Sequence, residues 1–101
     1  MSAESWLFDQ PRNCAVFTTR QVLDGEEPIL NVTHDSDDHG WQFIGSNARE
    51  DDIKIIALHE AVELDSSILQ VADLPVGWHA FRNSREDPWM REPIDNATET
   101  I

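Results

Sequence analysis

The sequence predicts an α+β fold, with a small, mainly antiparallel sheet and one or two short helices in a single domain. The chain has 101 residues, which is enough for one modest core. Its apolar residues, 40% of the total, fall in short runs bounded by turn residues, as short strands do. Two segments, 35–45 and 73–82, each lead from a turn into an aromatic strand. We expect an N-terminal arm over residues 1–12, the domain over 13–91 and a flexible tail over 92–101.

The arm and the first strand are both apolar. Residues 6–8 read Trp-Leu-Phe and precede Pro11, so the arm either packs its aromatic side chains on the domain or frays. Residues 13–18 are rich in side chains that fit a pleated surface, which predicts a largely buried strand. A helical turn over 20–23 should follow, because Gly25 can end it.

An antiparallel hairpin is expected next. Residues 29–34 predict a strand, a turn containing Gly40 follows, and the next strand begins at Trp41. Side chains two residues apart in a strand share a face, so Trp41 and Phe43 should both be mainly buried. The carboxylates between residues 35 and 38 should be mainly exposed.

Residues 46–52 are polar and predict a loop or one helical turn. The run 53–58 is too continuously apolar for a half-exposed strand, so a short buried strand followed by a turn is preferred. The apolar spacing from residue 58 to 62 also allows a helix.

The last third predicts one helix and two strands. Asp65 should cap a short helix that ends before Pro75. A strand is expected from Gly77 onward, and residues 89–90 could add an edge strand. The inner side of the helix is expected to carry Ile68, Leu69 and Ala72, while Trp78 and Ala80 share one face of the strand and Phe81 lies on the other.

The charge excludes some classes of partner. Asp and Glu number 20 against 7 Lys and Arg, which gives a net charge of −13. Nucleic acids and anionic membranes need cationic contacts, so neither is an expected partner. The charge favours solubility or attraction to a basic protein. The single cysteine, Cys14, and the lack of a signal or membrane-spanning run predict a cytoplasmic protein without disulfides.

The acidic turn contains residue types that can bind a metal ion. Asp35, Asp37 and Gly40 match the first ligands and the glycine of a calcium loop, but His39 and Ser46 stand where further oxygen ligands belong. By ligand type, a zinc or nickel site could use His34, Asp35, Asp37 and His39. A solvated turn is preferred, because turns favour Asp and Ser in any case. No cofactor is expected.

Enzyme signatures are not found in the sequence. His59 is followed four residues later by Glu63, where a zinc-peptidase motif needs a second histidine. Cys14 lies in an apolar run, where a thiol is usually inert. Two tryptophans are expected to build the core, and a remaining one could form a binding patch with Arg82, Arg85 and Arg91. The residues proposed for binding are Asp35, Asp37, Asp38, His39, Trp78, Arg82 and Trp89.

Six motifs follow one another along the chain. They are Cys14 with Val16, Asp37-Asp38-His39-Gly40-Trp41-Gln42-Phe43, Ile55-Ile56-Ala57-Leu58, Asp65-Ser66-Ser67-Ile68-Leu69, Leu74-Pro75-Val76-Gly77 and Ala80-Phe81-Arg82. Their order, from residue 13 to residue 91, resembles a family of small bacterial domains of unknown function, immunity protein family thirty-three, whose members occur beside polymorphic toxins. The resemblance implies a compact α+β domain without a cofactor and, in some relatives, neutralisation of a toxin. The family offers no catalytic residues to carry across.

Three functions remain open at this point. The preferred one is a cytosolic protein-binding module, such as an immunity protein that neutralises a basic toxin through an acidic surface. The second is a metal- or small-molecule-binding protein that uses the turn from His34 to His39. The third is a structural subunit of an oligomer, suggested by the number of tryptophans.

Overall fold

The computed structural model describes residues 6–47 and 49–94. It confirms the α+β class: six strands form one sheet in the order β4-β1-β3-β2-β5-β6, and neighbouring strands are antiparallel except for β1 and β3. The elements are β1 (Ala15–Thr19), α1 (Arg20–Leu23), β2 (Asn31–His34), β3 (Trp41–Ile44), the 3₁₀ helix η1 (Glu50–Asp52), β4 (Ile53–Ala57), α2 (Leu58–Leu64), the 3₁₀ helix η2 (Ser66–Val71), β5 (Trp78–Phe81) and β6 (Met90–Pro93).

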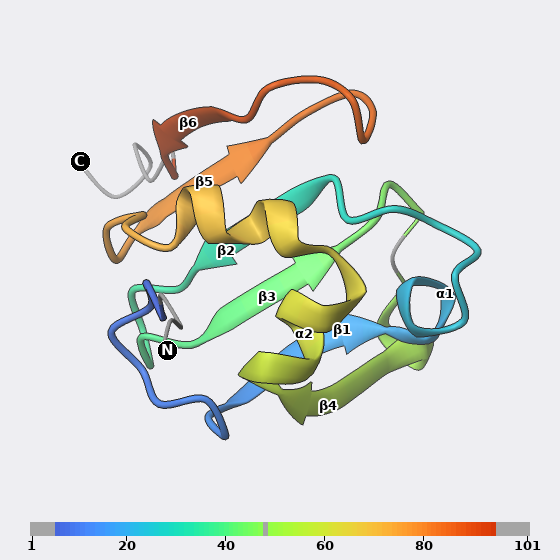
Figure 1. Ribbon diagram of the computed structural model, residues 1–101, viewed down its shortest axis with the longest axis horizontal. Helices are drawn as coiled ribbons and strands as arrows, with labels where there is room; N and C mark the ends of the chain where they lie inside the picture. The colour runs from blue at the N-terminus through green and yellow to red at the C-terminus, as the bar shows by residue number, and fades with distance from the viewer. Residues whose placement is uncertain (1–5, 48, 95–101) are drawn as a thin grey trace, which may run out of the picture.

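The core lies on one face of the sheet. Helices α2 and η2 cross in front of the strands in Figure 1, and this covered face carries the buried side chains of the central strands. The strand side chains on the opposite face are exposed or half-buried, except Thr19, which is buried where it caps α1. Among the described residues, no helix is long and apolar enough to cross a membrane. The core side chains on the covered face include Val16, Val32, Trp41, Phe43 and Ala80.

The expected hairpin is β2 and β3. Val32 pairs with Phe43 and His34 with Trp41, so these four side chains point to the covered face. Trp41 is 1% exposed and Phe43 is fully buried, which confirms the expectation for both. The strand begins at Asn31, two residues later than predicted.

The predicted burial of two strands is wrong. In β1, Val16 and Thr18 are buried, but Phe17 is 37% exposed because it points to the opposite face. Strand β4 is the last strand at one edge of the sheet, and its Ile53 and Ile55 are 44% and 66% exposed. The apolar run continues without a break from the edge strand β4 into the helix α2. It is therefore more continuously apolar than a typical half-exposed strand.

The end of that apolar run is helical. The prediction of a turn after residue 58 is wrong, since α2 begins there and buries Leu58 and Ala61 against the sheet. The carboxylate of Glu60 accepts a hydrogen bond of 2.8 Å from the backbone N–H of Ala57, which satisfies a donor at the start of the helix. The helical alternative, given second place from the sequence, therefore describes residues 58–64.

Asp65 caps the following helix, as predicted. Its side chain accepts a hydrogen bond from the backbone N–H of Ser67, and η2 buries Ile68 completely. The boundary predicted for the flexible tail is wrong, because residues 92–93 belong to β6 and Ile94 donates a backbone hydrogen bond to Gly77. The rest of the predicted tail, 95–101, lies outside the described residues, as does the start of the arm.

The described part of the arm packs on the core. Phe8 is 4% exposed and meets the ring of Trp41 edge-on, with 5.0 Å between ring centroids. Gln10 fixes the arm to the hairpin, because its side-chain oxygen accepts a hydrogen bond from the indole N–H of Trp41. Its backbone carbonyl accepts one from Trp6. The aromatic side chains of the arm thus complete the covered face.

Replacing Phe8 by Ala should lower the free energy of unfolding by about 3 kcal/mol, because a buried ring is lost and leaves a cavity. Leu7→Ala is the matched control. Leu7 is 56% exposed, so this change should cost less than about 1 kcal/mol. Urea denaturation followed by tryptophan fluorescence measures both values, and equal small losses would contradict a structural role for the arm.

Candidate functional site

The acidic turn between β2 and β3 is ordered by its own carboxylates. One oxygen of Asp35 accepts a hydrogen bond from the backbone N–H of Asp37 (2.9 Å), and one of Asp38 accepts from Gly40 (2.8 Å). His39 has φ of 60°, a left-handed conformation that few residues other than glycine adopt. The side chains of Asp37, Asp38 and His39 are exposed. The turn therefore presents negative charge in a defined geometry.

The four weak metal candidates are not brought together. His34 lies 7% exposed beneath the turn, where its ring stacks on Trp41 with centroids 3.9 Å apart. Its Nδ1 lies 2.8 Å from the carbonyl oxygen of Leu74, so Nδ1 carries the proton and donates. His39 instead points to solvent. In the described ranges, no cluster of three or more His, Cys, Asp or Glu side chains could hold a metal ion.

Arg82 was predicted in a binding patch, and that prediction is wrong. The residue is 6% exposed, and its guanidinium donates two hydrogen bonds to the carbonyl of Ile29, at 3.1 and 2.9 Å. It also donates to Asp65 (2.8 Å) and Ser67, and the ring of Trp89 covers it with 4.0 Å between the guanidinium carbon and the ring centroid. This cluster is structural, since it joins the end of β5 to the start of β2 and to η2.

The other members of the predicted patch are also occupied within the molecule. Arg91 pairs with Asp73 at 2.8 Å, and Arg85 lies 3.7 Å from Asp65. Trp78 and Trp89 are half-buried and pack against the core that contains Trp41. The arginines therefore do not form a free basic surface.

The ion pair of Arg82 changes the acidity of its partner. Burial raises the pKa of Asp65, but hydrogen bonds from Ser67 and from Arg82, together with the positive charge of Arg82, lower it further than burial raises it. The pKa of Asp65 consequently lies below its ordinary value. The carboxylate remains ionised at every pH where the protein is expected to act.

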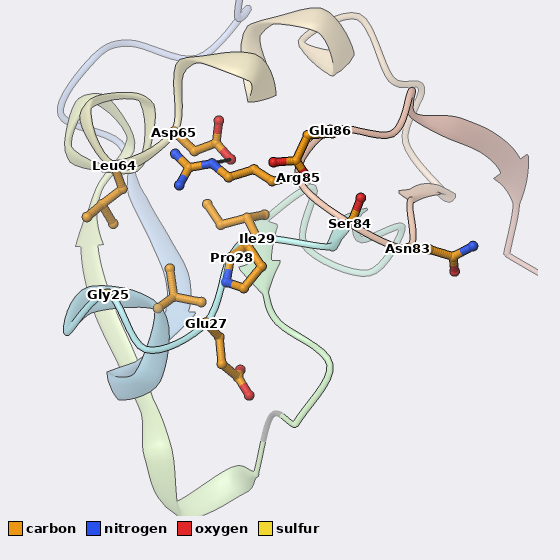
Figure 2. Close-up of a pocket in the computed structure, with 11 residues that line it drawn as sticks. Gly25, Glu27, Pro28, Ile29, Leu64, Asp65, Asn83, Ser84, Arg85 and Glu86 are labelled. Carbon is orange, nitrogen blue, oxygen red and sulfur yellow. Dashed lines mark ion pairs between the residues drawn. The ribbon is translucent and has the colours of Figure 1, made fainter.

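A cavity that was not predicted from the sequence is lined in part by Asp65 of the Asp65–Arg82 ion pair. It measures about 410 Å³, in the lower part of the range of about 300–1,000 Å³ that is typical of small-ligand sites. In Figure 2, Arg85 lies beside Asp65 at its rim, while Glu27 extends away from them. The carboxylate of Glu27 lies against Gly45. Three segments distant in sequence build the cavity, 22–29, 64–65 and 83–86, so no local motif could reveal it.

The polar groups of this cavity are better suited to structure than to chemistry. Asp65 already accepts from Ser67 and Arg82, so it is not available as a general base. The lining contains neither histidine nor cysteine. Its floor is apolar and includes Val22, Ile29 and Leu64.

Replacing Asp65 by Asn should lower the free energy of unfolding by about 3 kcal/mol, because Arg82 would remain buried without a counter-charge. Asp73→Asn removes the exposed pair with Arg91 and is the matched control, with an expected loss below about 1 kcal/mol. Urea denaturation at neutral pH compares the two variants. A loss for Asp65→Asn no larger than that of the control would contradict a central role for the buried pair.

The contribution of Asp65 to stability should depend on pH. Its pKa is lowered in the folded state from an ordinary value of 3.8, so the unfolded chain binds the proton first on acidification. The stabilisation is fully present above pH 3.8 and is lost as the pH falls through the lower, folded-state pKa. The difference in stability between the wild-type protein and Asp65→Asn should therefore shrink over that range. A difference that stays constant down to the acid transition would contradict the assignment.

Comparisons of the chain with protein-family models, with curated proteins and with solved structures gave no match. The fold and the geometry described above therefore stand on the chain's own residues, and the resemblance to immunity proteins stays a prediction.

Proposed function

We propose that the protein is a cytosolic protein-binding module that neutralises a basic protein, in the manner of an immunity protein covering a toxin. The observation that supports this proposal most strongly is the net charge of −13 on a chain of 101 residues. A field of this strength attracts basic surfaces and accelerates their association, and it repels nucleic acid and anionic lipid.

The distribution of charge supports the same function. Several cations are already used inside the molecule: Arg82 and Arg85 face Asp65, Arg91 pairs with Asp73, and Arg20 pairs with Asp24. Exposed carboxylates elsewhere face solvent, among them Asp37, Asp38, Glu50 and Asp51. These side chains are available to a cationic partner.

The acidic turn is suited to recognition because its geometry is set before binding. Hydrogen bonds to the backbone hold Asp35 and Asp38, so less conformational entropy is lost when a cationic partner is bound. A basic enzyme whose active site binds phosphate groups would be blocked by such a surface, because both compete for the same cations. The sole cysteine, Cys14, suits a reducing compartment.

Affinity capture from the native lysate at low and then moderate salt tests the proposal. We expect one basic protein to be retained at low salt and released as the salt concentration rises. Retained proteins that are acidic, or a complex that is insensitive to salt, would contradict it.

The double variant Asp37→Asn, Asp38→Asn sharpens this test. Asn keeps the side-chain oxygen that accepts from Gly40, so the turn should hold while two charges are lost. Association with the captured partner should slow by about threefold to tenfold. The control Glu26→Gln, Glu86→Gln changes the net charge equally at other exposed sites, and an equal effect there would contradict a specific role for the turn.

A further inference from the structure

The two edges of the sheet are protected unequally. Strand β6 reads Met-Arg-Glu-Pro, and its charges and proline discourage the addition of another strand. Strand β4, at the opposite edge in Figure 1, reads Ile-Lys-Ile-Ile-Ala and has one charge. Natural sheets usually block such an apolar edge. The edge at β4 lacks this protection, and a binding role would explain why.

The backbone of β4 offers hydrogen-bonding groups to solvent. The N–H of Leu58 donates to the carbonyl of Cys14 (2.8 Å), and bonded pairs in an antiparallel ladder recur at every second residue. Lys54 and Ile56 therefore bond toward β1, and the backbone groups of the alternate residues point outward. Of these, the N–H of Ile53 donates to Glu50 and that of Ala57 to Glu60, whereas the N–H and carbonyl of Ile55 face the open edge.

Apolar side chains lie directly beside that open position. Ile55 pairs with Phe17 of β1, and Ile53 lies two residues away on the same face. These three side chains, which we name the apolar corner, are 66%, 37% and 44% exposed, in the order Ile55, Phe17 and Ile53. A segment that paired with β4 could bury its own alternate side chains against the apolar corner.

Charge decides which segment fits. Exposed Glu50 and Asp51 lie just before β4, and exposed Glu60 and Glu63 lie just after it in α2. A second copy of the chain would bring the same carboxylates together, and each copy carries a net charge of −13. A segment with apolar residues at its centre and Lys or Arg near its ends would complement both the edge and its flanks.

We propose that β4 is the docking edge of this protein, and that an extended basic segment of the partner adds to the sheet beside it as a further strand. Backbone bonds to Ile55 supply the register, the apolar corner supplies burial, and the acidic flanks select Lys and Arg. This inference rests on the proposed function, and it names the surface and the segment through which that function would operate.

A displayed random library of peptides about nine residues long, enough to span the five residues of β4 and both acidic flanks, tests the proposal with the intact wild-type protein. We expect enriched peptides that alternate apolar residues at their centre and carry Lys or Arg near their ends. Ile55→Pro should weaken the binding of these peptides at least about tenfold, because it removes the outward N–H and places a ring at the edge.

Two control variants separate the contribution of the backbone N–H of Ile55 from that of apolar contact, and the edge at β4 from the other edge. Ile55→Ala retains the N–H and loses only apolar contact, so it should weaken binding by about threefold. Met90→Ala truncates an exposed apolar side chain at the other edge, 56% exposed against 66% for Ile55, and should leave binding unchanged. Urea denaturation checks that Ile55→Pro remains folded, as expected for a residue whose N–H points away from β1.

Several outcomes would overturn the proposal. They are a library without enrichment, peptides that bind Ile55→Pro as well as Ile55→Ala, and a wild-type protein that dimerises through β4 in sedimentation experiments. Each of these leaves the proposed function standing if salt-dependent capture of a basic protein succeeds. If the capture fails while peptides specific for β4 are still enriched, the proposed function is contradicted and the proposal that β4 is a docking edge stands.

Discussion

The buried guanidinium of Arg82 is the constraint on which the arrangement of elements depends. It binds the carbonyl of Ile29 ahead of β2, the capping carboxylate of Asp65 at the start of η2, and the carbonyl of Arg85 in the loop to β6. One side chain thus fixes three segments that lie far apart in sequence. Because a buried charge without partners is very unfavourable, these segments are held in one arrangement. The cavity of Figure 2 lies beside this cluster, with Asp65 and Arg85 in its lining.

The one-sided core explains the surface available for binding. Helices α2 and η2 cover one face of the sheet, and Phe8 from the arm packs there with the buried rings of Trp41 and Phe43. The opposite face and the edge at β4 remain accessible, and the acidic turn lies at the end of the β2–β3 hairpin. Apolar contact and negative charge thus occur on the same small molecule, which is the combination that a specific and rapidly associating inhibitor needs.

Features that depend on residues close in the sequence, such as a shared strand face and a helix cap, were predicted. The alternation at Trp41 and Phe43 predicted their common buried face, and Asp65 was predicted as a helix cap because it precedes the apolar stripe that begins at Ile68. Contacts between residues far apart in the sequence could not be predicted, because nothing near Arg82 in the sequence indicates that its partners are Ile29 and Asp65. Periodicity also cannot distinguish an edge strand from a central one, so Ile55 was expected to be buried. The weak candidates for metal ligands do not converge, because His34 belongs to the covered face and His39 to the turn.

The most direct test of this account is amide hydrogen exchange at β4, measured in the free protein and in complex with the captured basic partner. The account predicts rapid exchange at Ile55 in the free protein, because its N–H faces solvent, and strong protection in the complex. Lys54 and Ile56, which bond toward β1, should be protected in both states. Unchanged exchange at Ile55, with new protection appearing elsewhere on the surface, would contradict the claim that a basic partner docks at this edge.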